Sequence, residues 1–424
     1  VAAKLGLREP EYKEPEMTLS WDLYYCVVLW STIMQVLSLL ALSAACCAAV
    51  GRAIRRRRGD KLRVSEPIAV VVPCYLPNEE PIIEGTARHL LDKIESVDDM
   101  TVYLAYNTPR DMPEAEASLR KLADETSSGR LGRRLVVIRV EGSRSKAENL
   151  NHVIPTISAP YVAIYDADHH PDPDSLAISI WQLLESGCDC VQGSTYIREG
   201  CALARMLVCA EFFVTYFVVL PAMQALTGTG FFGGANGVWR TSSLKRLNFD
   251  EAALTEDIDY FARSIVRHGF RFEFLPESCS GELLPSGIRA LWRQRLRWAM
   301  GWDQVTLRHA SAFLSAKTSL RVRAGLCYIF FCRWLSQTCA FLIVALNMQA
   351  ALLWRLEDDK QDVRTPARVA QLQIASFYGY CAFIVYALLR ACFRRSPYLV
   401  VGVALYFVVM PVIVVCNSVL LVVS

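Results

Sequence analysis

The sequence predicts an α/β domain with a mostly parallel sheet, extended by interfacial helices and anchored by about four transmembrane helices. Two observations predict this fold class. Between residues 65 and 285, short apolar runs alternate with segments of helical pattern, which is typical of a parallel sheet covered by helices. Outside this region, apolar segments of about 20 residues or more are long enough to cross roughly 30 Å of hydrocarbon. They are 24–50, 326–354, 372–393 and 398–424.

Composition agrees with a protein of the lipid bilayer and argues against one class of partner. Of the 424 residues, 53% are hydrophobic, above the roughly 45–50% of soluble domains. The net charge of +3 is too small to indicate a nucleic-acid partner. The first residue is Val and the last apolar segment stops at Ser424, so we expect a piece of a longer chain. Self-association into a homo-oligomer is left open.

Basic residues beside the apolar segments predict the orientation of the chain. They are Arg55, Arg56, Arg57 and Arg58 after the first segment, Arg321 and Arg323 before the second, and Arg390, Arg394 and Arg395 between the last two. Lys and Arg collect on the cytosolic side, so residues 65–285 form a cytosolic domain and residues 1–23 lie outside the cytosol. The predicted location is the plasma membrane, or the Golgi in a eukaryote. Recruitment of acidic lipid is the alternative role of the four-arginine run.

The elements of the domain follow in order. Strands are predicted at 68–73, 101–105, 135–140 and 161–165, and helices at 79–96, 113–126 and from about 145. Parallel sheets bind ligands beyond the carboxyl ends of their strands. Residues 73–80, 106–111, 142–151 and 166–170 should therefore surround one crevice. Two charged apolar helices follow. We expect 202–227 to lie at the membrane surface or against the sheet and not to span the membrane, and we expect an interfacial helix at 286–315.

Asp166-Ala-Asp168 directly follows the fourth predicted strand. Two carboxylates one residue apart at a strand end can both face the crevice, and such hard oxygen ligands suit Mg²⁺ or Mn²⁺. His169 and His170 are further candidate ligands. The alternative is an ordinary turn in which Asp acts as a capping residue.

Thr255-Glu-Asp257 precedes an amphipathic helix that ends at Gly269. Asp257 is a candidate general base, with Glu256 beside it in the same motif. The helix dipole lowers the pKa of a carboxyl in the first turn, so apolar surroundings or another carboxylate must oppose it. Plain helix capping is the alternative.

Two further motifs are candidates for ligand contact. Gln294, Arg297 and Trp298 share one helix face, where an arginine suits phosphate and an indole suits a sugar ring. An interfacial anchor helix is the alternative. The run from Phe231 to Gly237 has three glycines that let backbone approach a ligand, or it is simply a flexible loop.

Taken in order, these motifs resemble the processive family-2 glycosyltransferases, which include cellulose, curdlan, chitin and hyaluronan synthases. The resemblance covers about residues 65–310 and implies a GT-A fold. The segments that carry it are Pro73-Cys-Tyr75, Lys146-Ala-Glu-Asn-Leu-Asn151, Asp166-Ala-Asp168, Phe231-Phe-Gly-Gly234, Thr255-Glu-Asp257 and Gln294-Arg-Leu-Arg-Trp298.

The resemblance implies a role for each matched residue. Nucleotide contacts are expected from Tyr75, Glu79, Lys146 and Asn149. Asp166 and Asp168 are expected to bind the diphosphate and the metal, and Asp257 to be the base. Phe232 and Gly233 should lie near the terminal sugar of the acceptor. Gln294, Arg297 and Trp298 should position diphosphate and acceptor beside the membrane.

The sequence departs from the family pattern at two places. Tyr106-Asn107 stands where the family has an Asp pair that reads uracil; Asn107 can still hydrogen-bond a base, and Asp111 is near. No FxVTxK-type segment follows the membrane helices. These two positions therefore do not carry the family's reading of uracil or a specific match to cellulose synthase.

The resemblance implies an inverting, metal-dependent β-glycosyltransferase that moves a sugar, with glucose as the leading guess, from a UDP-sugar to a growing polysaccharide. Polar residues in the second apolar segment suggest a passage for the product, or simple helix contacts: Arg333, Gln337, Asn347 and Gln349. A lipid glycosyltransferase of the ceramide type, a membrane channel or transporter, and a pseudoenzyme are the alternatives.

Overall fold

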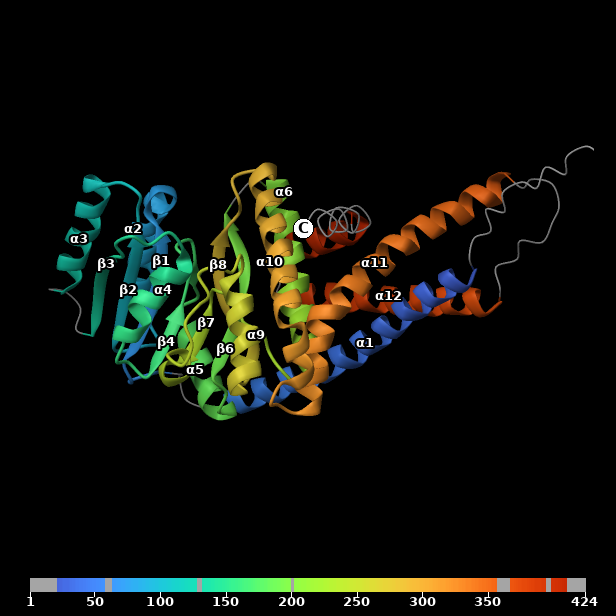
Figure 1. Ribbon diagram of the computed structural model, residues 1–424, viewed down its shortest axis with the longest axis horizontal. Helices are drawn as coiled ribbons and strands as arrows, with labels where there is room; N and C mark the ends of the chain where they lie inside the picture. Colours follow the sequence, from blue (N-terminus) through green and yellow to red (C-terminus); the bar gives the residue numbers. More distant parts are fainter. Residues whose placement is uncertain are drawn as a thin grey trace, which may run out of the picture.

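The structure is a computed structural model that describes residues 21–57, 63–127, 132–199, 202–356, 367–393 and 398–409. Predictions for residues 1–20, for Arg394 and Arg395, and for 410–424 lie outside this part. In Figure 1, a sheet with its covering helices lies at one end, and the long apolar helices lie at the other.

The first half of the sheet is parallel, as the alternation of elements predicted. Its strands are β1 (Ile68–Tyr75), β2 (Met100–Asn107), β3 (Arg133–Arg139) and β4 (Tyr161–Ile164), in the order β3-β2-β1-β4. Apolar side chains of β1 are buried on both faces, which is the environment of a strand inside a parallel sheet. The register sets Tyr75 of β1 beside Asn107 of β2, so the carboxyl ends of these strands meet at one edge.

Helices connect these strands close to the predicted bounds. They are α2 (Leu76–Lys93), α3 (Pro113–Ser127), α4 (Lys146–Val153) and the short 3₁₀ turn η2 (Ile154–Thr156). The first helix begins three residues earlier than predicted, with a proline in its first turn. Proline suits this position because its missing N–H would have no helical partner there.

The second half of the sheet contains antiparallel pairs, which the sequence did not reveal. Its strands are β5 (His170–Pro171), β6 (Cys190–Glu199), β7 (Gly237–Arg240) and β8 (Phe272–Leu283), and the full order is β3-β2-β1-β4-β7-β6-β8-β5. β7 is antiparallel to both β4 and β6, whereas β6 and β8 are parallel. The helices are α5 (Ser175–Ser186), α8 (Thr241–Leu244) and α9 (Glu256–His268).

The sheet has an apolar core on each face. One core packs α2, α3 and α5 against the strands. The other packs α4, α9, α10 (Ile288–Ser315) and the start of α11 (Leu320–Leu356) against the opposite face. Its centre is Trp239 of β7, whose ring meets Phe232, Tyr260 and Phe272 edge to face at centroid distances of 5.0–5.4 Å. The helix that bears the Gln294 motif is thus part of the core of the sheet domain.

Three predicted spans coincide with helices long and apolar enough to cross a membrane. They are Leu23–Gly51 in α1 (Trp21–Arg57), Leu320–Ile343 in α11, and Gln371–Ala391 in α12 (Ala367–Phe393). The fourth predicted span, 398–424, is described only to residue 409, where Tyr398–Val409 is a shorter apolar helix.

The segment predicted at 202–227 is also a candidate span by length and hydropathy, as Leu203–Thr227. It consists of α6 (Ala202–Val214), a π-helical turn (Thr215–Val219) and α7 (Leu220–Thr227), with a proline at the start of α7. Half of it is buried, and it packs on β6, β8 and α1. Its contact with the sheet agrees with the prediction of a helix lying against the domain. Figure 1 shows α6 and α10 between the sheet and the long apolar helices.

We predict that Trp239→Ala lowers the free energy of unfolding by about 3–5 kcal/mol, because it removes a fully buried indole at the centre of an aromatic core. Denaturant unfolding of the detergent-purified protein measures the change. Trp292→Ala is the matched control, since its side chain is exposed, and it should change stability by less than about 0.5 kcal/mol. Equal effects of the two substitutions would contradict the placement of Trp239.

Candidate active site

Lys146 lies at the centre of the predicted site because the start of α4 is fixed. Ser145 caps the helix by accepting a hydrogen bond from the backbone N–H of Glu148 at 3.2 Å. The Lys146 ammonium then donates to the carboxylate of Asp166 and to the carbonyl oxygen of Gly234, the latter at 3.2 Å. It also lies 3.6 Å from Oε1 of Glu256. One side chain therefore joins three motifs that the sequence predicted separately.

Charge pairing controls the protonation of this group. Burial alone would lower the pKa of Lys146, but the carboxylates of Asp166 and Glu256 outweigh it and raise that pKa. Burial likewise acts to raise the pKa of Asp166, and the charge of Lys146 reverses the effect, so Asp166 stays ionised. The charges of His169 and of Arg297 in α10 add to the same lowering of the Asp166 pKa.

Asp168 and the two histidines after it are held by the end of β8. The Asp168 carboxylate accepts a hydrogen bond from the backbone N–H of Leu283 at 3.3 Å. His169 is buried and lies between Ser280 (3.0 Å) and Glu282 (3.3 Å), whereas His170 stacks on His89 at a centroid distance of 4.2 Å. Both histidines thus have structural partners, which corrects their prediction as metal ligands.

The donor set for a cation is therefore a pair of carboxylates, Asp166 and Asp168. Among the residues that the structure describes, no group of three or more His, Cys, Asp or Glu side chains is arranged to hold a metal ion. Two hard oxygen groups fit Mg²⁺ or Mn²⁺ when a ligand supplies the remaining oxygens.

Glu79 and Tyr75 lie at the carboxyl end of β1, as predicted. The carboxylate of Glu79 accepts a hydrogen bond from the backbone N–H of Tyr75 at 2.7 Å. Burial, helped by the negative charges of Asp166 and Asp168, raises the pKa of Glu79 to about 7. The Tyr75 side chain is 41% exposed, so it is available to a ligand.

Asn107 and Asn149 lie in the interior and not on the surface of the site. They are 4% and 1% exposed. Asn149 donates to the side-chain oxygen of Asn107 at 2.8 Å, and Asn107 donates to the carbonyl oxygen of Ser143 at 3.2 Å. Their amides hold the loop before α4 in place. Both amides are therefore engaged within the protein, and their direct contacts with a nucleotide stay predictions.

The glycine-rich loop shows the same separation of roles. The Phe232 side chain is fully buried against Trp239, and its contact with the acceptor stays a prediction. Gly233 is exposed, and its N–H donates to Gln192 at 2.9 Å. Gln192, a buried residue of β6, also donates to the carbonyl oxygen of Ala235 at 2.7 Å. It therefore holds the loop, and nothing in the sequence singled it out.

Asp257 lies against this loop at the start of α9. Its carboxylate accepts a hydrogen bond from the N–H of Ile258 at 2.9 Å. Burial, with the neighbouring charge of Glu256 next in size, raises the pKa of Asp257 to about 7. Apolar surroundings and another carboxylate therefore both oppose the lowering of the Asp257 pKa that the helix dipole would cause. A carboxyl that titrates near neutral pH suits general base catalysis.

Gly234 and Gly301 permit this arrangement. Gly234 has a φ of +83°, and a Cβ there would lie 2.7 Å from the Asp257 carboxylate. A Cβ on Gly301 of α10 would lie 2.3 Å from a methyl carbon of Thr255. Gly234 belongs to the glycine run noted in the sequence, but its close neighbour is a catalytic candidate and not a ligand.

The Gln294 motif approaches the site from α10. Arg297 is exposed and donates to the carbonyl oxygen of Leu254 at 3.3 Å. Trp298 is half-buried, with the guanidinium of Arg295 over its ring at 4.5 Å. Gln294 is half-buried one turn before Trp298. All three predicted residues lie on one helix that contacts the Asp257 motif.

The predicted intramembrane residue Arg333 has a contact between helices. It pairs with Asp303 of α10 and lies over the ring of Trp302 at 5.9 Å. This contact supports the helix-contact alternative for Arg333. The side chains of Asn347 and Gln349 lie outside the described part of the chain.

The fold and the clustered carboxylates define this chain as a glycosyltransferase with a GT-A fold. Residues 66–301 match the family described as glycosyltransferase like family 2. The chain belongs to that family, as the resemblance of its motifs predicted.

Curated relatives include enzymes that make polysaccharides. The chain is 30% identical over 178 residues to glucomannan 4-beta-mannosyltransferase 7 of Arabidopsis thaliana, covering 40% of this chain and 31% of that protein. It is 26% identical over 269 residues to cellulose synthase 2 of Novacetimonas hansenii, covering 62% and 16%. It is 30% identical over 174 residues to the poly-beta-1,6-N-acetyl-D-glucosamine synthase of Staphylococcus epidermidis, covering 40% of this chain and 41% of that protein. The chain thus spans less than half the length of these relatives.

A solved structure has the same fold. It is the mannosyltransferase PcManGT from Pyrobaculum calidifontis, in complex with GDP-Man and Mn²⁺, with a TM-score of 0.50. The two proteins are 19% identical, and the alignment covers 88% of this chain and 98% of that one.

We predict that Gly234→Ala lowers the transfer rate by about 100-fold, because the added methyl group displaces Asp257 and a misplaced catalytic group costs about that much. Steady-state sugar transfer with purified protein measures the effect. Gly187→Ala is the matched control: its φ is +64°, but its added methyl group meets only the end of the Arg271 side chain. The two glycines share a left-handed backbone, so equal loss in both variants would contradict the role assigned to Gly234.

Proposed function

We propose that this protein is an inverting β-glycosyltransferase that transfers a sugar from a UDP-sugar to a growing polysaccharide at the membrane. The leading sugar is glucose, and the product would pass through the membrane helices. The observation that carries the proposal is the Lys146 ammonium, which contacts Asp166, Gly234 and Glu256. The motifs proposed to bind the donor, to contact the acceptor and to supply the base therefore meet at Lys146.

The donor diphosphate would lie between Lys146 and Arg297, whose positive charges both act on Asp166. Asp166 and Asp168 would hold Mg²⁺ or Mn²⁺. The bound cation would neutralise the charge of the departing diphosphate. The Mn²⁺ in the complex of the mannosyltransferase of like fold supports this donor set.

Asp257 would take the proton from the acceptor hydroxyl as that oxygen attacks the anomeric carbon. The new bond forms on the face opposite the departing diphosphate, so an α-linked donor gives a β-linkage. The exposed backbone at Gly233 and the indole of Trp298 are the proposed acceptor contacts, since aromatic faces suit sugar rings. Gln294, on the same helix, would support the diphosphate.

Nucleotide choice depends on the side chains at the carboxyl ends of β1 and β2. The amide of Asn107 is buried and hydrogen-bonded within the protein, and Tyr75 is the exposed side chain beside it. The structural relative was solved with GDP-Man. A panel of labelled UDP- and GDP-sugars, incubated with membranes that contain this protein, tests the choice. Glycanase sensitivity and product size identify the sugar, its linkage and processivity.

A lipid acceptor is the second candidate. The helix α10 exposes large apolar side chains, among them Ile288, Leu307 and Leu314, which fit a helix lying at the bilayer surface. A lipid acceptor could reach the site from that side. Extraction of the labelled product into organic solvent distinguishes it from a polysaccharide.

We further propose that the domain faces the cytosol. The Lys and Arg clusters beside the spans favour this orientation. Protease protection of sealed vesicles tests it.

We predict that Asp257→Asn lowers sugar transfer by at least about 1,000-fold with UDP binding retained, because only the proton acceptor is lost. Asp168→Asn should abolish transfer and also weaken metal-dependent UDP binding. Calorimetric titration of UDP, with and without Mn²⁺, separates the two variants. Full activity in either one removes that residue from the mechanism.

We predict an acidic limb near pH 7 in the pH profile of kcat/KM. Asp257 has a pKa of about 7 and accepts a proton only when ionised, so the rate should fall about tenfold per unit below that pH and level off above it. Glu256→Gln should move the limb to lower pH, since removal of a like charge lowers the pKa of Asp257. An unmoved limb would assign the titration to another group.

A further inference from the structure

We propose that Asn151 is a positioning residue for the reaction: its amide fixes the loop that leads into the Thr255-Glu-Asp257 motif. The inference rests on the proposed function in one respect, namely that Asp257 acts as the base. The site assignments above give Asn151 no role, although it closes the motif that begins at Lys146.

The amide of Asn151 is matched to both backbone groups of a single residue. Its oxygen accepts a hydrogen bond from the N–H of Phe249 at 2.8 Å, and its nitrogen donates to the carbonyl oxygen of Phe249 at 2.9 Å. The same nitrogen lies 3.1 Å from the carboxylate of Glu251. A carboxamide offers one acceptor and donors on a short stem, so Asp, Ser or Leu cannot reproduce this set of contacts.

Phe249 transmits this hold to α9. Its side chain is buried and stacks on Tyr260 of α9 at a centroid distance of 4.4 Å. Asn151 thus fixes the backbone of a residue whose ring already packs on the helix that begins at Glu256. Displacement of Phe249 would move the first turn of that helix.

The opposite side of the loop is held by α10. Gln304 accepts a hydrogen bond from the N–H of Leu254 at 3.0 Å and donates to the carbonyl oxygen of Ala252 at 3.4 Å. Arg308 forms an ion pair with Asp250. The loop is therefore clamped between α4 and α10, and Asn151 is the contact that α4 provides.

Lys146 begins α4, and Asn151 lies in its last turn. The first contacts Glu256, and the second holds the chain seven residues earlier, at Phe249. Because Lys146 and Asn151 belong to the same helix, their contacts together set the position and the orientation of the segment that contains Asp257. Loss of Asn151 leaves the contacts from α10 and the Lys146 contact with Glu256, but frees the backbone at Phe249.

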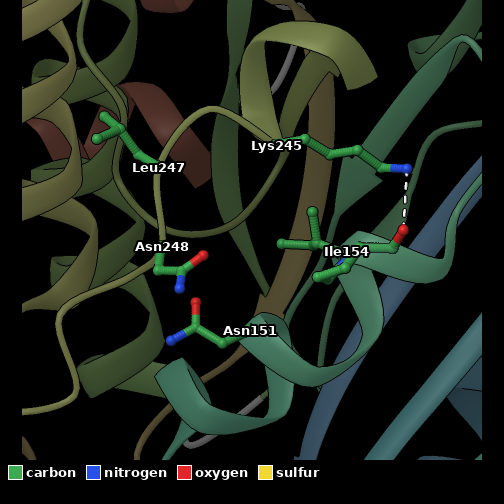
Figure 2. A pocket seen from close by; sticks show the side chains of 6 residues that line it. Asn151, Ile154, Lys245, Leu247 and Asn248 are labelled. Atoms are coloured by element: carbon green, nitrogen blue, oxygen red, sulfur yellow. Dashed lines mark hydrogen bonds between the residues drawn. The ribbon is translucent and has the colours of Figure 1, made fainter.

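Packing beside Asn151 leaves space for such a movement. A cavity of about 190 Å³ is lined by Asn151, Ile154, Pro155, Lys245, Leu247 and Asn248. Figure 2 shows the amides of Asn151 and Asn248 facing one another there. Asn248 is exposed, and within the described part of the chain no hydrogen bond involves its side chain. It is therefore a matched control that loses an amide at the same cavity without loosening the loop.

The test measures kcat, donor KM and UDP affinity of the full-length protein in detergent. We expect Asn151→Ala to lower kcat about 10- to 100-fold, with UDP affinity unchanged within about twofold, because the base is misplaced and the donor contacts remain. Asn248→Ala should retain wild-type kcat within about twofold. The melting temperature of each variant identifies any that fails to fold.

A rescue separates positioning from general damage. Asn151→Asp places a carboxylate against Glu251 and the carbonyl oxygen of Phe249, so kcat should fall at least as far as in Asn151→Ala. Glu251→Gln alone should have little effect. Combined with Asn151→Asp, it supplies a donor to the new carboxylate and should restore kcat at least about fivefold over Asn151→Asp.

The outcomes distinguish the inference from the proposed function. If Asn151→Ala and Asn248→Ala have equal kcat, or if the double variant gains nothing over Asn151→Asp, the positioning role is wrong. If the wild type transfers no sugar, or Asp257→Asn remains active, the proposed function fails first. Weaker UDP binding in Asn151→Ala with unchanged kcat would make Asn151 a donor contact and overturn the inference.

Discussion

The contacts of the Lys146 ammonium are the constraint on which the rest of the site depends. The group lies among the carboxylates of Asp166 and Glu256, and these come from a strand end and from a helix start that are 90 residues apart in sequence. Without a cation between them, the two carboxylates would repel one another in a poorly hydrated place. With it, the pKa of Asp166 is lowered and Asp166 stays ionised. Burial and the charge of Glu256 raise the pKa of Asp257 to about 7, against the lowering effect of Lys146.

Close backbone approach is the second requirement, and two glycines meet it. Gly234 leaves room for Asp257, and Gly301 leaves room for Thr255. Each lies where a different element meets the start of α9. The sheet supplies the first through its glycine-rich loop, and α10 supplies the second. The segment from Thr255 to Asp257 is therefore enclosed on two sides by glycine backbone, because a side chain at either glycine would collide with it.

Much of this arrangement was predictable from the sequence, and the reason is local. Strands β1 to β4, helices α2 to α4 and the convergence of Lys146, Asp166 and Asp257 follow from short apolar runs and from motif order. The antiparallel strands were not predictable, since their pairing depends on residues far apart in sequence. The burial of Asn107, Asn149 and Phe232 was not predictable for another reason: a motif identifies which residues belong to a site but not which of them are buried beneath it. Gln192 carried no signal, because a single buried glutamine resembles any strand residue.

The half-buried segment from Ala202 to Thr227 links the two ends of the molecule. Its side chains, such as Phe213 and Phe217, share an apolar cluster with Leu42 of α1 and with Phe407, which lies in the helix Tyr398–Val409. The same segment contacts strands of the catalytic sheet. Domain and membrane helices are therefore parts of one hydrophobic unit. Removal of the terminal helices to obtain a water-soluble fragment would expose the apolar surface of this shared cluster. Purification of the enzyme therefore requires detergent or lipid, even when only its chemistry is of interest.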